Sequence, residues 1–182
     1  MRLRRIGSEQ ELRLAHEWLT DPDNADFFDW GRETLSLLTF RVMVNKAHDV
    51  YRLFTSDDSD APIGLAVLSG VNQIRKTADF WIVLGSKTHR SQGYGVRVLN
   101  AMMEYAFVDL GLDVLHAFVA ERNRPSRRMF EKAGWQFTGR QRRGHWMDGR
   151  LVDRLFVDIL REEFRPAEPA IDSNAAGIGT VT

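Results

Sequence analysis

The 182-residue sequence contains no cysteine. Disulfide bonds, thiolate metal sites and a cysteine nucleophile are therefore excluded, and an intracellular location is the simplest interpretation. The sequence also lacks any apolar run near the about 18 residues that cross a membrane, and the basic residues 1–5 are not followed by the apolar stretch of a signal peptide. We therefore expect a cytoplasmic protein that has no membrane partner.

An excess of charge of either sign is missing as well. Lysine and arginine together number 25, and aspartate and glutamate together also number 25. A chain with balanced charge has no overall field that attracts a polyanion. We therefore expect no nucleic-acid partner.

Several catalytic motifs are also absent. The sequence has neither the G-x-x-x-x-G-K-S/T phosphate loop of nucleotide hydrolases nor the G-x-S-x-G elbow of serine hydrolases. Its five histidines are scattered without H-E-x-x-H spacing. We therefore expect no metal site.

The composition fits one globular domain. With 43% hydrophobic and 27% charged residues, the chain can bury one substantial core but hardly two. Residues 165–182 combine two prolines with small and polar residues and lack hydrophobic periodicity, which is typical of a disordered tail. We predict a single domain over residues 1–164, followed by such a tail.

The first part of the chain predicts a short strand and then two helices. Residues 3–6 can open a sheet, and Ser8 with Glu11 forms a capping-box pattern at the start of a helix. The second helix is expected to end near Lys46. The apolar residues at helical spacing are Leu12, Ala15 and Leu19 in the first helix and Leu35, Leu38 and Val42 in the second.

Strand-like and helical segments alternate through the rest of the chain. The predicted strands are residues 51–55, 63–68, 77–84, 114–120, 135–138 and 151–159. A helix over residues 96–110 carries an apolar stripe and is ended by Gly111, and another helix runs from Pro125 to Gly134. The stripe consists of Val96, Leu99, Met103, Ala106 and Leu110. We predict an α/β fold with a mixed, largely antiparallel sheet of about six to seven strands flanked by about four helices.

The segment Arg90-Ser91-Gln92-Gly93-Tyr94-Gly95 lies between the apolar strand and the helix over residues 96–110. Its two glycines allow close approach of a ligand, and the first turn of the helix offers unpaired N–H groups to an anion. The segment therefore predicts a site for a pyrophosphate, although such glycines can also make a simple structural turn.

A second motif follows at suitable spacing. Asn123-Arg124-Pro125-Ser126 comes after the strand over residues 114–120, and Lys132-Ala133-Gly134-Trp135 ends the next helix. With both motifs present, residues 63–160 resemble the GNAT superfamily of N-acetyltransferases, whose members share a Q/R-x-x-G-x-G/A acetyl-CoA loop and a later N-x-x-A/S…K-x-G-F/W segment. Ile82-Val83-Leu84-Gly85 and Asp148-Gly149-Arg150 resemble the group of ribosomal-protein N-terminal, polyamine and amino-sugar acetyltransferases.

The resemblance implies acetyl-CoA as co-substrate and assigns residues to its binding. Val83 and Leu84 would pair with the pantetheine arm as a neighbouring strand does, and one of their N–H groups would donate to the thioester oxygen. Asn123 and Ser126 would bind the same arm, or serve only as helix caps. The pyrophosphate would be held by Arg90 and the backbone of Ser91, Gln92, Gly93, Tyr94 and Gly95.

The same resemblance implies that Asp79, on the strand before the loop, acts as general base through a water molecule. Its alternative role is a solvated residue paired with Arg75 or Lys76. Many superfamily members place a tyrosine seven residues after the asparagine, where its hydroxyl protonates the leaving thiolate. Phe130 stands there in this chain, so water would have to deliver that proton.

Two aromatic clusters are candidates for acceptor binding. Phe28 and Trp30, among acidic neighbours, can bind a cationic amine or stack on a sugar, or form a packed turn between helices. A basic cluster could bind a nucleotide diphosphate or an acidic substrate, but a solvated hairpin tip is the default interpretation. This cluster consists of Arg140, Arg142, Arg143, His145 and Trp146.

These observations predict an acetyl-CoA-dependent N-acetyltransferase. Its acceptor would be a primary amine: an amino sugar, free or nucleotide-linked, a polyamine, an amino-acid-like amine or a protein N-terminus. A non-catalytic acyl-CoA-binding or protein-interaction module is the alternative, for which Phe130 and the alternative role of Asp79 are the main arguments. The early helices or an exposed strand could support a homodimer.

Overall fold

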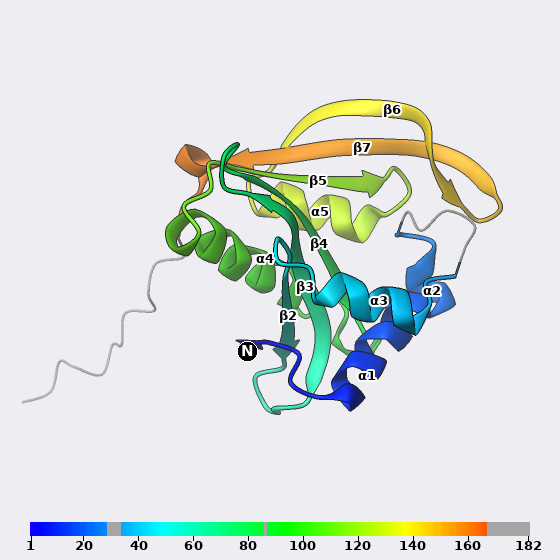
Figure 1. Cartoon of the computed structure of the whole chain (residues 1–182). Helices are drawn as coiled ribbons and strands as arrows, with labels where there is room; N and C mark the ends of the chain where they lie inside the picture. Colours follow the sequence, from blue (N-terminus) through cyan, green and yellow to red (C-terminus); the bar gives the residue numbers. More distant parts are fainter. Residues whose placement is uncertain (29–33, 86, 167–182) are drawn as a thin grey trace, which may run out of the picture.

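The computed structural model describes residues 1–28, 34–85 and 87–166. Seven strands form one twisted sheet in the order β1-β2-β3-β4-β5-β7-β6, with helices on both faces (Figure 1). The strands are β1 (Leu3–Arg4), β2 (Val50–Thr55), β3 (Pro62–Asn72), β4 (Thr77–Leu84), β5 (Val114–Ala120), β6 (Gln136–Met147) and β7 (Arg150–Leu160). The helices are α1 (Glu9–Thr20), α2 (Pro22–Ala25), α3 (Leu37–Val44), α4 (Tyr94–Glu104) and α5 (Arg124–Lys132).

The predicted fold class is confirmed. Every neighbouring pair of strands is antiparallel except β4 and β5, which are parallel, so the sheet is mixed and largely antiparallel. The additional helix relative to the prediction is α2, a single turn that begins at Pro22 directly after α1. Proline is favoured at the first helical position because its missing N–H has no partner to lose there.

The sheet separates two hydrophobic cores. Successive side chains of a strand point to opposite faces, so β4 contributes to both cores in alternation. Ala78 and Phe80 pack with the buried residues of α4 and α5. Val83 and Trp81 pack on the other face with those of α1 and α3. The helices on each side of the sheet therefore pack their apolar faces against it and cover one of the two cores.

The first helix forms as predicted. The Ser8 side chain accepts the Glu11 N–H at 3.2 Å, and the Glu11 carboxylate accepts the Gly7 N–H at 2.8 Å. These bonds satisfy two donors at the helix start that have no partner within the helix. The predicted apolar residues Leu12, Ala15 and Leu19 are buried.

The second helix buries a different face from the predicted one. Leu38 and Val42 are 71% and 59% exposed, and Leu35 is buried before the helix begins. Phe40 is the residue that α3 buries, in an edge-to-face contact with Tyr51 at 6.1 Å between ring centroids. The larger ring decides the orientation because it removes more apolar area from water. The homodimer expected for the early helices stays a prediction.

The predicted helix over residues 96–110 is α4 followed by a π-helical turn, Tyr105–Asp109. Of the predicted stripe, Leu99, Met103 and Ala106 are buried, whereas Val96 and Leu110 are only half-buried. The Leu110 N–H donates to the carbonyl of the fifth residue before it, at 3.0 Å. This wider turn rotates the end of the helix, which is why the straight periodicity fails there.

The last hairpin is much longer than predicted, since β6 extends to Met147. Asp148 and Gly149 form its turn with φ of 50° and 71°, the conformation of a type I′ hairpin turn. The basic cluster therefore lies along β6, and its interpretation as a hairpin tip is wrong. His145 is 1% exposed and its Nε2 bonds the Asp26 carbonyl oxygen at 2.7 Å.

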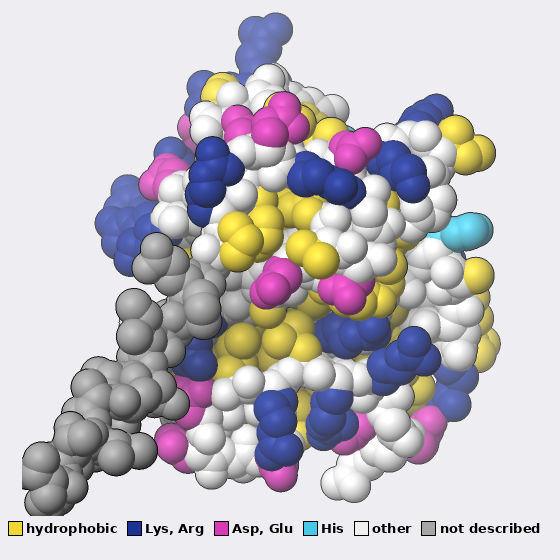
Figure 2. Space-filling view, turned by 90° about the vertical axis from the view of Figure 1, so that its left-hand side faces the viewer, with side chains coloured by type: hydrophobic (Ala, Val, Ile, Leu, Met, Phe, Trp, Pro, Cys, Tyr) yellow, Lys and Arg dark blue, Asp and Glu magenta, His cyan; other side chains and the backbone are white. Residues whose placement is uncertain are grey.

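The surface carries mixed charges. On the face shown in Figure 2, basic and acidic side chains are interspersed around a central group of hydrophobic ones. This distribution agrees with equal numbers of the two signs in the sequence. None of the helices in the described ranges is both long enough and apolar enough to span a membrane.

We expect Gly64→Ala to destabilise the sheet. Gly64 faces Leu84 across β3 and β4, and a Cβ atom there would lie 2.2 Å from Phe54 Cζ and 2.4 Å from the Val83 carbonyl oxygen. A backbone atom cannot move aside, so the free energy of unfolding should fall by about 1–3 kcal/mol in urea denaturation.

Gly139→Ala is the matched control for this substitution. A Cβ atom at Gly139 would meet nothing within 4 Å, so the free energy of unfolding of Gly139→Ala should be unchanged or slightly higher. Equal stability of the two variants would contradict the close approach of β3 and β4.

Candidate active site

The site begins where β4 and β5 separate. The parallel pairing joins Thr77 to Val114, Ala78 to Leu115 and Asp79 to His116, and it extends no further. Beyond Asp79, β4 continues beside β3 while β5 continues beside β7 (Figure 1). The result is a V-shaped opening in the middle of the sheet, with Asp79 at its apex.

Backbone groups of β4 face this opening. The Gly85 N–H donates to the Ile63 carbonyl oxygen of β3 at 2.8 Å. Because successive residues of a strand direct their N–H and C=O groups to opposite sides, Val83 also faces β3, whereas Ile82 and Leu84 face the opening. The prediction for Leu84 fits this geometry, but that for Val83 needs correction, and Ile82 takes its place.

A cleft of about 860 Å³ passes through the opening. Its lining residues on the α4 and α5 side of the sheet include Phe80, Ile82, Ala117, Val119, Asn123, Ser126, Met129 and Phe130. Its lining residues on the α1 and α3 side include Phe28, Asp49, Tyr51, Ser69, Gly70, Asp79, Trp81 and Phe118. We call the first part the donor half and the second part the acceptor half.

The N-terminus of α4 lacks a side-chain cap. The side chains of Ser8, Ser36 and Asn123 cap α1, α3 and α5, but α4 begins at Gly93 without such a bond. No acidic residue lies in its first turn either. The unpaired N–H groups and the positive end of the helix dipole therefore remain available to an anion.

The two glycines of this loop have different roles. Gly93 has φ of 81°, which only glycine adopts at low cost, and Ser91 before it also has a positive φ of 64°. At Gly95 a Cβ atom would lie 3.0 Å from Met129 Sδ, so this glycine lets α4 approach α5. The loop needs one glycine for its conformation and the other for packing.

The side chains of the loop bind to the protein itself. Arg90 Nη2 donates to Asn24 Oδ1 at 3.2 Å, and Gln92 Nε2 donates to the Thr88 carbonyl oxygen at 2.8 Å. These bonds engage both side chains within the protein and leave the backbone N–H groups of the loop as its groups available to an anion, while the predicted role of Arg90 stays a prediction.

Asp57, in the turn between β2 and β3, fixes the first turn of α4. Its carboxylate accepts both terminal nitrogens of Arg97 at 2.7 and 2.8 Å and the N-terminal ammonium at 2.6 Å. The Arg97 guanidinium and this ammonium hold the pKa of Asp57 well below its usual range. The Asp57 N–H also donates to the Tyr94 hydroxyl at 3.4 Å, so Tyr94 contributes its side chain to packing.

Asn123 caps a helix, as one of the alternatives considered for it, and the contact of Asn123 and Ser126 with a ligand stays a prediction. Asn123 Oδ1 accepts the Ser126 N–H at 3.1 Å and caps α5. Both residues also line the donor half of the cleft. The amide nitrogen of Asn123 and the hydroxyl of Ser126 remain available for a ligand.

Asp79 reaches solvent at the apex of the opening, but the residues around the cleft partly desolvate its carboxylate. Within the described ranges its carboxylate makes no hydrogen bond or ion pair, and Lys76 donates to Gln73 instead, at 3.0 Å. Burial of the carboxylate raises the pKa of Asp79, and the nearby His116 lowers it to a smaller extent. A carboxyl group with a raised pKa in a cleft is suited to accept a proton.

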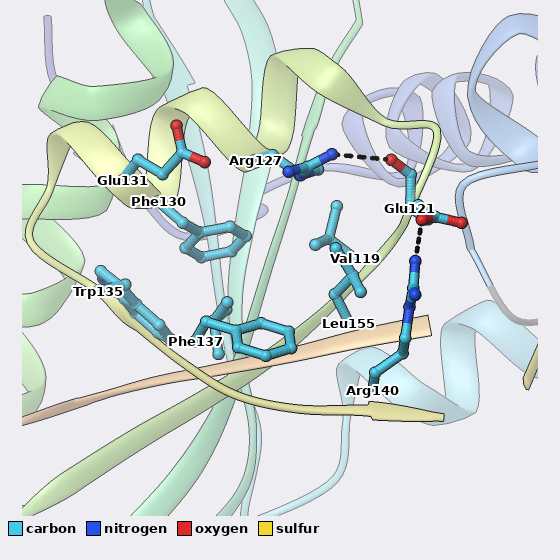
Figure 3. Close-up of a pocket in the computed structure, with 10 residues that line it drawn as sticks. Val119, Glu121, Arg127, Phe130, Glu131, Trp135, Phe137, Arg140 and Leu155 are labelled. Atoms are coloured by element: carbon cyan, nitrogen blue, oxygen red, sulfur yellow. Dashed lines mark hydrogen bonds and ion pairs between the residues drawn. The ribbon is translucent and has the colours of Figure 1, made fainter. Parts of the chain in front are cut away.

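Phe130 forms the wall between the cleft and a second cavity. Its ring is buried, edge-to-face with Phe80 at 6.2 Å and beside Trp135 at 4.8 Å. The second cavity, of about 570 Å³, lies between α5 and the strands β5, β7 and β6 (Figure 3). At its rim Glu121 accepts hydrogen bonds from Arg140 through its carboxylate and from Arg127 through its carbonyl oxygen.

The acceptor half is aromatic and acidic. Phe28 meets Trp81 edge-to-face with ring centroids 5.6 Å apart. Phe28, one of the two residues predicted to bind the acceptor, lines this half of the cleft. The other, Trp30, falls outside the described residues. Tyr51 and Asp49 line the same half, although the sequence did not indicate them.

Comparison with known proteins fits this geometry. Residues 1–136 match the model of the acetyltransferase (GNAT) domain. The chain belongs to the GNAT family. The spermidine N(1)-acetyltransferase of Vibrio cholerae is 26% identical to this GNAT domain over 62% of the chain, a match that spans 65% of the relative's length. The putative ribosomal N-acetyltransferase YdaF of Bacillus subtilis is 24% identical over 90% of the chain and 86% of its own length.

Solved structures confirm the fold. A crystal structure of spermidine N-acetyltransferase from Vibrio cholerae, in complex with CoA and spermine, superposes on this GNAT domain with a TM-score of 0.78. The superposition covers 89% of this chain and 96% of the other, at 21% identity. The prediction of a GNAT fold from two short motifs is therefore confirmed.

The structure brings together most of the predicted site of the GNAT domain. Asp79, Asn123 and Ser126 line one cleft, and the backbone of Leu84 faces the same opening in the sheet. Gly95, at the end of the loop over residues 90–95, lies against Met129, which lines that cleft as well. Asp49, Tyr51 and Trp81 were missed because none of them belongs to a local sequence motif. The pairing of Tyr51 with Val67 and of Val67 with Trp81 places these side chains beside the opening. Strand register is set by the tertiary structure, so the sequence did not indicate it.

Proposed function

We propose that this GNAT domain transfers an acetyl group from acetyl-CoA to a primary amine of a small molecule. The observation that carries the proposal is the opening between β4 and β5, with Asp79 at its apex and with Met129, which lies against Gly95 in the uncapped first turn of α4, in the lining of the same cleft. An anion site, a free strand edge and a carboxylate thus lie along one path. Relatives that bear the name N-acetyltransferase support this assignment.

In this proposal the donor half holds acetyl-CoA. The N–H groups of Gln92 to Gly95 bind the pyrophosphate at the positive end of α4. Ile82 and Leu84 pair with the amide groups of the pantetheine arm, as an added strand would. Asn123 and Ser126 contribute their free polar atoms from the opposite wall of the cleft.

Acetyl-CoA supplies an activated thioester, so the residues mainly have to position an uncharged amine and move a proton. The amine nitrogen forms the new C–N bond, the C–S bond breaks, and the electron pair leaves with the sulfur. Asp79 accepts the amine proton through a water molecule, and the N–H of Ile82 or Leu84 stabilises the developing charge on the carbonyl oxygen. Phe130 has no hydroxyl, so water protonates the leaving thiolate.

The acceptor half favours a cationic small molecule. Its carboxylates attract an ammonium group, and the faces of Trp81 and Phe28 suit its aliphatic part. The names of the relatives add spermidine and a ribosomal substrate as acceptor types. A cleft of about 860 Å³ lined by aromatic rings suits the first of these better than a folded protein.

The test is release of free coenzyme A from acetyl-CoA with separate panels of polyamines, amino sugars, amino acids and N-terminal peptides. We expect turnover with small amines and little with peptides. Tight binding of acetyl-CoA without turnover on any panel would instead favour the non-catalytic acyl-CoA-binding module, the alternative that Phe130 supports.

A further inference from the structure

The acceptor half contains a second carboxylate besides Asp79. Asp49 immediately precedes β2, and its Oδ1 accepts the Gly70 N–H at 2.7 Å. A Cβ atom at Gly70 would lie 3.9 Å from Asp79 Oδ2. Gly70 therefore lies between the two carboxylates, and the bond from its N–H fixes the orientation of Asp49.

Tyr51 places an unsatisfied hydroxyl in the same half of the cleft. The residue is 5% exposed, lines the cleft, and its hydroxyl has no hydrogen-bond partner within the described ranges. Burying a hydroxyl without a partner costs about 1–3 kcal/mol, so such groups need an explanation. A ligand that bonds this hydroxyl provides one.

The strand register places these groups on one face. Tyr51 pairs with Val67 and Val67 with Trp81, while in the next row Ser69 pairs with Asp79. Residues paired across neighbouring strands point to the same side of the sheet, about 5 Å apart. The hydroxyl of Tyr51, the indole of Trp81 and both carboxylates thus surround the same space.

This space has an aromatic wall and a lining with more aspartate than lysine or arginine side chains. Trp81 meets Tyr51 edge-to-face at 5.9 Å between centroids and gives the space an apolar wall. Among the described residues that line the cleft, Lys46 is the one lysine or arginine, and its side chain is exposed. The aspartate and lysine side chains of the lining, two carboxylates against one ammonium, therefore carry a net negative charge.

We infer that Asp49 and Tyr51 form a second cation subsite, which selects primary alkylamines that carry another positively charged nitrogen. The inference rests on the proposed function, since it assigns the reacting amine to Asp79. Asp49 attracts the second ammonium, the Tyr51 hydroxyl accepts one of its N–H bonds, and Trp81 covers the methylene chain between the nitrogens. With β3 between β2 and β4, the Cα atoms of Asp49 and Asp79 are roughly 10 Å apart, which suits a short aliphatic chain.

The experiment compares 1,4-diaminobutane with butylamine as acceptors. The two probes share their reacting group and differ in the second nitrogen, so the ratio of their kcat/KM values isolates the subsite. We expect this ratio to favour the diamine and to fall about tenfold in Asp49→Asn, since loss of one charge-assisted contact is worth about that factor. Asparagine can still accept the Gly70 N–H, so the fold is kept.

Two further variants sharpen the test. Tyr51→Phe keeps the ring contacts with Phe40 and Trp81 and should lower the ratio about threefold. Asp58→Asn removes the same charge from the exposed turn at the other end of β2 and should leave the ratio unchanged. A ratio near one in the wild type, or an equal ratio in Asp49→Asn, would overturn the subsite while leaving the proposed acetyl transfer intact.

Calorimetry of 1,4-diaminobutane binding separates the two proposals if no amine is acetylated. Wild-type protein should then bind the diamine about tenfold more tightly than Asp49→Asn, even though the proposed transfer has failed. Equal binding by the two proteins would overturn the subsite independently of any turnover.

Discussion

Asp79→Asn should lower kcat by about 10²–10⁴-fold while leaving the affinity for acetyl-CoA nearly unchanged. Asparagine has almost the shape of aspartate but cannot accept the proton of the attacking amine. Asp79 also lies at the apex of the opening, away from the N-terminus of α4 and from the strand edge beyond it. Loss of the carboxylate should therefore affect proton transfer and not donor binding.

The pH dependence gives a second measure of the same role. A general base works in its ionised form, so kcat/KM should fall as the pH falls through the pKa of Asp79. Burial raises that pKa, so the acid limb should lie above the pH at which an ordinary aspartate titrates. This limb should disappear in Asp79→Asn.

Steady-state kinetics and calorimetry of acetyl-CoA binding would measure these effects, with Asp58→Asn as the control for loss of one negative charge. Equal losses of rate and of acetyl-CoA affinity in Asp79→Asn would show that the residue supports the structure and is not the base. The charge control should behave as the wild type, because its side chain is exposed in the turn between β2 and β3.

Gly93→Ala should weaken acetyl-CoA binding by about 5- to 30-fold. Gly93 has φ of 81° at the start of α4, and an alanine in that conformation is strained by about 1–2 kcal/mol. Relief of the strain would turn the neighbouring N–H groups away from the position of the pyrophosphate. The loss should be seen in KM for acetyl-CoA and in its dissociation constant.

Gly134→Ala is the matched control for strain. Gly134 has φ of 83°, and, as at Gly93, an added Cβ atom would meet nothing within 4 Å. It follows α5, so it lies far along the chain from the loop. Both variants should lose similar stability in thermal denaturation, but the control should bind acetyl-CoA as the wild type does. Equal loss of binding in the two would contradict an anion site at the start of α4.

Local patterns predicted the elements whose ends are decided locally. The strands over residues 77–84 and 114–120 have the predicted ends, because turn residues flank each of them. The capping box at Ser8 and the glycine that ends α5 were found for the same reason. In each case the physical cause lies within a few residues of the feature.

Features that depend on packing were predicted less well. The face that α3 buries is set by the contact of Phe40 with Tyr51, and the length of β6 is set by its pairing with β7. Val83 was predicted to direct its backbone groups to the opening, but they face β3. The direction of a backbone N–H depends on which neighbour the strand pairs with.

The sequence by itself determined the family resemblance, the α/β class and the anion loop, since the glycines and the helix start that make the loop are contiguous. The tertiary structure alone decided where β4 parts from β5, which of their backbone groups become free, and that Asp49 and Tyr51 lie beside Asp79. Those relations join residues on separate strands, and their distances follow from strand register and twist, which no single segment contains.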